Sequence, residues 1–189
     1  MSRWMIAGLL LWWLTRLVAL QALPLHNDEG LHLTRAVEVW NGHPFWAISD
    51  GKIINHWVIA ALLPQSAPAF AGRLATLLVC AAGLAAAASL ARRWGGPPGW
   101  TLVCGLWIAA PYLFFYERLA FSDAQAGALV VVAVWAAARA ARRSRLDDAV
   151  LTGLALSLAI LFKFTAAPFA LTIAMLIVAG RAPWRRRAA

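Results

Sequence analysis

The sequence predicts an all-α integral membrane protein with about six transmembrane helices and with interfacial helices in its first outer loop. Of its 189 residues, 62% are apolar and only 13% are charged, which is far more apolar than a soluble globular domain. The apolar residues form runs of about the length that crosses a bilayer. The basic residues lie in short segments between these runs, so the net charge of +9 encodes topology and indicates no nucleic-acid partner.

A single membrane domain over residues 1–189 follows from the length, which leaves no room for a large soluble domain beside six helices. The first apolar run is too long for a cleavable signal and lacks a clean cleavage site, so we expect a retained helix. The predicted outer loop covers residues 24–68, and the predicted spans are residues 4–23, 69–90, 100–115, 124–141, 149–162 and 164–179.

The distribution of charge predicts a cytoplasmic N-terminus, because that orientation collects most arginines on the inner side. Six of the eight acids, among them Asp50 and Glu117, then lie on the outer face. The Arg- and Ala-rich composition is typical of a bacterial chain, so we expect a multi-pass protein of the bacterial inner (plasma) membrane. The arginines expected inside are Arg3, Arg92, Arg93, Arg139, Arg142, Arg143, Arg145, Arg181, Arg185, Arg186 and Arg187.

The outer loop contains all four histidines and is rich in aromatic residues, so it is not a flexible linker. Its spacing predicts a helix that starts near Asp28, and a second apolar piece, residues 53–63, ends at Pro64 and is too short to span. Both pieces would lie on the membrane. The apolar side of the first would carry Leu31, Leu33, Ala36, Val37 and Trp40.

Asp28 and Glu29 follow the first span directly and are the candidate catalytic residues. A carboxylate pair at a bilayer surface can act as a general base, because desolvation and a like-charged neighbour raise one pKa. Two other interpretations remain: the pair only caps the helix, or it binds a divalent metal together with His32. No third strong metal ligand is evident, so we expect no metal or other cofactor. The alternative is a divalent metal bound at Asp28, Glu29 and His32.

Several charged residues near the outer face are candidate substrate-binding residues, because charges near a membrane are costly unless they line a polar cavity. Basic groups beside carboxylates would suit a phosphate leaving group next to a general base. These candidates are Asp123, Arg118, Lys163, Lys52, Arg73, Arg16 and His32.

Four blocks in this order resemble the polytopic GT-C glycosyltransferases of the protein O-mannosyltransferase, aminoarabinose transferase and Rgt type. The blocks are the Asp28-Glu29 pair with the loop stretch from Asp50-Gly51-Lys52 to Pro64, then Ala71-Gly72-Arg73-Leu74, then Pro111 with Arg118 and Asp123, and finally Gly153-Leu154-Ala155 through Lys163. The resemblance covers nearly the whole chain and corresponds to the N-terminal part of such enzymes, which usually continue for several more spans.

The resemblance implies inverting transfer of a sugar from a polyprenyl-phosphate donor to a lipid, glycan or protein acceptor at the outer face. By family analogy Asp28 would be the general base, Glu29 or Asp123 would orient acceptor or donor, and Arg118 and Lys163 would neutralise the lipid phosphate. A partner chain would supply the missing helices if the chain does not act alone. The alternative is a non-catalytic membrane subunit derived from such an enzyme.

Overall fold

The computed structural model describes residues 3–46, 51–62 and 67–181, and every regular element in these ranges is a helix. The predicted all-α class is therefore confirmed for this part of the chain. Asp50, Pro64 and the terminal Arg185, Arg186 and Arg187 lie outside the described residues. The elements are α1 (Arg3–Leu17), α2 (Asn27–Trp40), α3 (Ile53–Ala61), α4 (Pro68–Ala109), α5 (Pro111–Glu117), α6 (Ser122–Arg143), α7 (Leu146–Phe162), the 3₁₀ turn η2 (Phe164–Ala166) and α8 (Phe169–Arg181).

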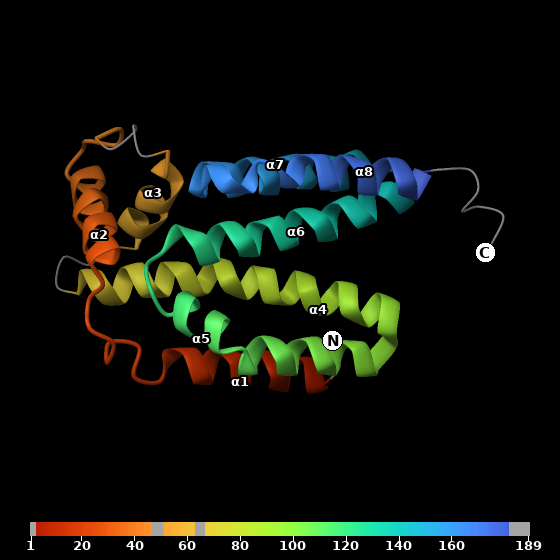
Figure 1. The fold of residues 1–189 in the computed structure, drawn as a ribbon, viewed down its shortest axis with the longest axis horizontal. Helices are drawn as coiled ribbons and strands as arrows, with labels where there is room; N and C mark the ends of the chain where they lie inside the picture. Colours follow the sequence, from red (N-terminus) through yellow and green to blue (C-terminus); the bar gives the residue numbers. More distant parts are fainter. Residues whose placement is uncertain (1–2, 47–50, 63–66, 182–189) are drawn as a thin grey trace.

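Helix α4 consists of two arms, residues 68–95 and 97–109, that run in opposite directions (Figure 1). Gly96 joins the arms with a φ of 61°, a left-handed conformation that glycine adopts without a steric penalty. Pro97 and Pro98 follow directly, and they suit the start of a new helix because their missing N–H groups would be unpaired there in any case. The reversal replaces a rod of 42 residues with a helical hairpin.

The long helices lie side by side in alternating directions, so the molecule has two distinct ends (Figure 1). Helices α2 and α3 lie at one end, here called the α2–α3 end, where α1 finishes and α6 begins. The opposite end, here called the arginine end, holds the reversal at Gly96 and the turn from α6 to α7 at Ser144.

Among the residues that the structure describes, two helices, α4 and α6, are long and apolar enough to cross a membrane by length and composition. Two shorter apolar helical stretches lie at residues 6–17 and 164–180. Helix α1 ends at Leu17 rather than at the predicted residue 23, so its 15 residues extend about 22 Å. Ala19, with a left-handed φ of 51°, breaks the helical run.

Helices α2 and α3 form inside the predicted outer loop, and the buried side of α2 agrees with the predicted one only at Leu33 and Ala36. Glu29, His32, Leu33 and Ala36 face the bundle, whereas Leu31 and Trp40 are exposed. The prediction weighted apolar spacing alone, and it was wrong for Leu31 and Trp40 because two polar side chains, Glu29 and His32, find buried partners and take places that apolar residues would otherwise fill.

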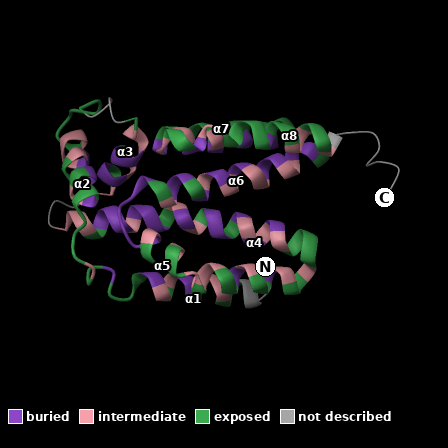
Figure 2. Cartoon of the chain, viewed as in Figure 1, coloured by how far each residue is buried: buried purple, intermediate pink, exposed green. Residues whose placement is uncertain are grey.

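Many of the buried residues of α4 and α6 are alanines, as the Ala-rich second run predicted, and Figure 2 shows that both helices carry buried residues. A Cβ atom on Gly83 of α4 would lie 2.7 Å from Cβ of Ala128 on α6, so the two helices touch at this point. Cys80 and Cys104 are free and buried in the same cluster, which confirms that both act as small packing residues.

Candidate functional site

Asp28 and Glu29 lie in the first turn of α2 and point to different surroundings. Successive residues of a helix are rotated by about 100° about its axis, so the two side chains leave the helix in different directions. Glu29 is fully buried, and it forms a capping box with His26, which precedes the helix. The side chain of Asp28 is exposed. No ion pair to it occurs within the described residues.

Glu29 forms a two-point ion pair with Arg73, which is also buried. The Arg73 guanidinium donates from Nε to Glu29 Oε1 at 2.8 Å and from Nη2 to Glu29 Oε2 at 2.7 Å. The backbone N–H of Ala120 donates to Oε1 as well, at 2.9 Å. Arg73 further donates to the carbonyls of Leu20 and Leu23. Glu29 therefore ties α2 to α4 and to the loops beside them, and its oxygens are occupied.

A second buried ion pair joins Arg16 of α1 to Glu117 of α5, with 2.8 Å between Nε and Oε2. The indole N–H groups of Trp12 and Trp107 also donate to Glu117. Arg16 uses its remaining donors on the carbonyls of Trp107 and Ile108. Both charges thus have full sets of hydrogen-bond partners, as buried charges require.

Arg118 secures the end of α1. Its Nη2 donates to the carbonyls of Val18 and Ala19 at 2.9 and 2.6 Å, which gives partners to two carbonyls of the turn that follows α1. Burial lowers the pKa of Arg118 from its ordinary value, and the nearby Arg73 and Arg16 lower it further. The three predicted arginines therefore gather at the α2–α3 end, where they hold backbone carbonyls and two carboxylates.

Asp123 and Lys163 form a partly exposed ion pair at the α2–α3 end. Asp123 lies in the first turn of α6, and Lys163 lies in the break between α7 and η2. The Lys163 ammonium group donates to the Asp123 carboxylate, and the two side chains are 30% and 43% exposed, respectively. These two predicted substrate-binding residues are 40 positions apart in the sequence, and the fold brings them together.

Apolar grooves lead away from this pair along α6. One cavity of about 360 Å³ is lined by Asp123, Gly127, Val131 and the aromatic residues Tyr112 and Tyr116. A second cavity of about 330 Å³ contains the first three of these residues again, together with Lys163. The shared residues are spaced four apart and so lie on one face of the helix. The site thus has a charged head and an apolar groove below it.

His32 and His56 pack against each other at the same end, with 3.2 Å between Nδ1 of His32 and Nε2 of His56. Burial lowers the pKa of each to about 4, with Lys52 and Arg35 adding to the effect, so both are neutral at pH 7. The negative charges of Asp28 and Asp123 act on His32 in the opposite direction. Both exposed carboxylates and Lys52 are therefore close enough to His32 to act on its charge.

A buried polar cluster below this pair contains residues that the sequence did not single out. Gln125 donates to Asn55 Oδ1 at 2.9 Å and to the Thr76 hydroxyl at 2.8 Å, joining α6, α3 and α4. Within the described structure, Asn55 Nδ2, Gln125 Oε1 and Ser122 Oγ are buried without a hydrogen-bond partner. The sequence did contain a signal for this cluster, since Gln125 and Thr76 are polar residues inside strongly apolar runs.

The alternative metal site at Asp28, Glu29 and His32 is not assembled. No group of three His, Cys, Asp or Glu side chains in the described parts of the chain is placed to hold a metal ion. Arg73 and the Ala120 amide occupy Glu29, and His56 contacts the Nδ1 atom of His32.

Comparison with known proteins relates the chain to one family. Residues 52–189 match the family described as dolichyl-phosphate-mannose-protein mannosyltransferase, which is of the GT-C glycosyltransferase kind. No curated protein and no solved structure matches the chain. The matched region includes Arg73, Arg118, Asp123 and Lys163, and it covers most of the sequence. This chain therefore belongs to the dolichyl-phosphate-mannose-protein mannosyltransferase family.

Proposed function

We propose that this chain transfers a sugar from a polyprenyl-phosphate donor to an acceptor hydroxyl at the membrane face that carries α2 and α3. The observation that carries the proposal is the exposed Asp123–Lys163 pair at the head of an apolar groove along α6. This combination matches the chemistry of a lipid-linked sugar, which has a phosphate head and a long hydrocarbon chain. The family to which the chain belongs uses such a donor.

In the proposed reaction Lys163 neutralises the donor phosphate, since an ammonium group forms strong charge-assisted contacts with phosphate oxygens. The hydrocarbon chain follows the groove past Gly127 and Val131. Asp123 orients the phosphate-bearing sugar through its contact with Lys163.

Asp28 is the proposed general base. Its carboxylate takes the proton of the acceptor hydroxyl while the hydroxyl oxygen bonds to the anomeric carbon. The bond from that carbon to the phosphate oxygen breaks, and the polyprenyl phosphate leaves with the electron pair. The configuration at the anomeric carbon is inverted because the acceptor attacks opposite the leaving group. The exposed position of Asp28, at the same end of the bundle as Asp123, supports this role.

The proposed setting is a bacterial inner membrane crossed six times, with the arginine end in the cytoplasm. The two arms of α4 and the antiparallel order of the helices support this arrangement. In this setting α2 and α3 lie on the outer surface, with Leu31 and Trp40 turned toward lipid.

A non-catalytic membrane subunit is the second candidate function, and a specific observation favours it. Four of the nine predicted site residues, Arg16, Glu29, Arg73 and Arg118, are engaged in contacts that hold the fold together. Such a subunit would keep these contacts and would need no chemistry at Asp28.

The experiment measures sugar transfer from a panel of radiolabelled polyprenyl-phosphate sugars in membranes that contain the chain. The compared proteins are the wild type, Asp28→Asn, and Glu38→Gln as a matched loss of one carboxylate on the same helix. The proposal predicts transfer by the wild type and by Glu38→Gln, and none by Asp28→Asn. Absence of transfer by a folded wild-type chain with every donor would favour the non-catalytic subunit.

A further inference from the structure

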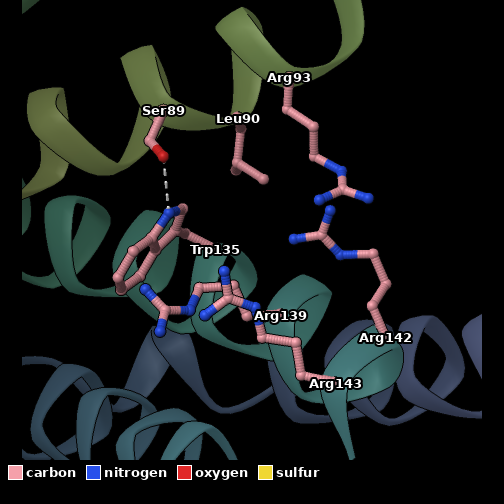
Figure 3. A pocket seen from close by; sticks show the side chains of 7 residues that line it. All are labelled: Ser89, Leu90, Arg93, Trp135, Arg139, Arg142 and Arg143. Carbon is pink, nitrogen blue, oxygen red and sulfur yellow. Dashed lines mark hydrogen bonds between the residues drawn. The ribbon is translucent and has the colours of Figure 1, made fainter. Parts of the chain in front are cut away.

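A basic pocket lies at the arginine end, on the side of the bundle away from the proposed active site. It has a volume of about 200 Å³ and is formed by the C-terminal part of the first arm of α4 and the C-terminal part of α6 (Figure 3). Four arginines line it, together with an aromatic side chain and a hydroxyl group: Arg93, Arg139, Arg142, Arg143, Trp135 and Ser89.

The arginines of this pocket are not balanced by acids. Arg139 forms an ion pair with Asp148 at 2.7 Å, which leaves Arg93, Arg142 and Arg143 without a carboxylate partner among the described residues. Figure 3 shows the Arg93 and Arg142 guanidinium groups directed toward each other from the two helices. Like charges that converge repel each other, and an anion between them would turn this repulsion into attraction.

The rest of the pocket is preorganised. The Trp135 indole N–H donates to Ser89 Oγ at 2.9 Å, and the Arg139 guanidinium stacks over the Trp135 ring at 4.5 Å from its centroid. These contacts fix one wall of the pocket, and Arg93, Arg142 and Arg143 line the rest of it. Arg142 also donates from Nε to the carbonyl of Ala138 at 2.8 Å. All four basic residues are arginine, whose planar fork binds two phosphate oxygens at once, whereas a lysine offers a point charge.

The residues around the pocket are of the kind that lies at the level of the lipid headgroups. Trp94, next to Arg93, is 67% exposed, and Leu146, beyond the turn after α6, is 79% exposed. Exposed tryptophans are typical of the membrane–water interface, and basic pockets between helices at that level bind the headgroups of anionic lipids.

We propose that this pocket binds the phosphate group of an anionic phospholipid, with Arg93 and Arg142 on the phosphate oxygens and Arg143 beside them. The lipid would bridge α4 and α6 at the arginine end. This site is separate from the sugar donor site, since its residues lie at the opposite end of the bundle (Figure 1).

The test counts bound lipids by native mass spectrometry on the full chain purified in a zwitterionic detergent. The probes are phosphatidylglycerol, phosphatidylcholine and inorganic phosphate. The variants are Arg93→Gln and Arg142→Gln, and Arg145→Gln is the matched control. Arg145 carries the same charge near the same end, yet it pairs with Asp147 outside the pocket and is 64% exposed.

The expected result is retention of one phosphatidylglycerol by the wild type and by Arg145→Gln, with at least a tenfold lower bound fraction in Arg93→Gln and in Arg142→Gln. Phosphatidylcholine should not be retained at this site. Equal retention by all four proteins would overturn the proposal. Inorganic phosphate that binds in the millimolar range and displaces phosphatidylglycerol completely would overturn the lipid as the source of the phosphate group.

Discussion

At the scale of single residues, the charges of the α2–α3 end differ in how deeply they are buried and in what they touch. Glu29 and Arg73 are almost inaccessible and satisfy each other, as do Arg16 and Glu117. Asp28, by contrast, is exposed. A buried and fully paired ion stabilises the local packing but cannot reach a substrate, whereas an exposed carboxylate can exchange a proton with one.

The first prediction concerns Lys163 and the donor. In Lys163→Gln the proposed contact to the lipid phosphate loses its charge, and a hydrogen bond to a charged group contributes about 1.5–3 kcal/mol. We therefore expect the KM for the polyprenyl-phosphate sugar to rise about tenfold to hundredfold. Steady-state kinetics at varied donor concentration measure this rise. An unchanged KM would remove Lys163 from the donor site.

The second prediction concerns pH. In the folded chain the pKa of His32 and that of His56 are about 4, below the ordinary value of 6.5. Between these values the unfolded chain binds protons that the folded chain does not, so stability is full above pH 6.5 and falls as the pH drops toward 4. At about 1.4 kcal/mol per pKa unit, the loss is on the order of 3 kcal/mol for one histidine.

Thermal unfolding between pH 7 and pH 4 measures this loss. His32→Gln should flatten the decline, whereas His43→Gln should leave it unchanged because His43 is 62% exposed and lies outside the buried pair. Parallel curves for the wild type and His32→Gln would show that the buried pair does not set the acid limit of stability.

At the scale of elements, the sequence predicted the long apolar helices and the break near Lys163 more successfully than the ends of α1 and the packing of α2. The spacing of apolar residues predicts the buried side of a helix only where that side packs against other apolar residues. It missed Glu29 and His32 as inward residues because their partners, Arg73 and His56, come from other helices. Tertiary hydrogen bonds of this kind leave no local pattern in the sequence.

The third prediction tests the contact of α4 with α6 at Gly83. A leucine there would place its Cβ 2.7 Å from Ala128 Cβ and 2.8 Å from Ala128 Cα, so the backbones must separate. We expect a loss of about 1–3 kcal/mol in the free energy of unfolding. Gly153→Leu is the matched control, because nothing lies within 4 Å of a Cβ at Gly153. A comparison of thermal unfolding in detergent decides the point, and equal stabilities would contradict the close approach.

At the scale of the whole molecule, the antiparallel helices separate exposed acids at one end from unbalanced arginines at the other. Asp28 and Asp123 begin helices at the α2–α3 end, and Arg142 and Arg143 finish α6 at the arginine end. The sequence predicted this division, because successive spans run in opposite directions and so place the acid-bearing and the arginine-bearing connections on opposite sides. It did not predict that Arg73 and Arg118 hold carbonyls, since their partners depend on the course of residues 18–24.

The fourth prediction concerns orientation in the membrane. A cysteine at the exposed Thr34 of α2 should react with an impermeant maleimide added outside intact cells, and a cysteine at Arg145 should react only after permeabilisation. Cys80 and Cys104 are buried and provide a low background. Labelling of the Arg145 position from outside, with the Thr34 position protected, would invert the proposed topology.

The central claim is that Asp28 performs chemistry while its neighbour Glu29 holds the fold, and one paired measurement tests it most directly. Sugar transfer and thermal unfolding are measured on the same preparations of wild type, Asp28→Asn and Glu29→Gln. We predict that Asp28→Asn abolishes transfer with an unchanged Tm. Glu29→Gln should lose about 3–5 kcal/mol of stability, because it leaves Arg73 buried without its partner. Full transfer by Asp28→Asn, or a Glu29→Gln protein as stable as the wild type, would contradict the claim.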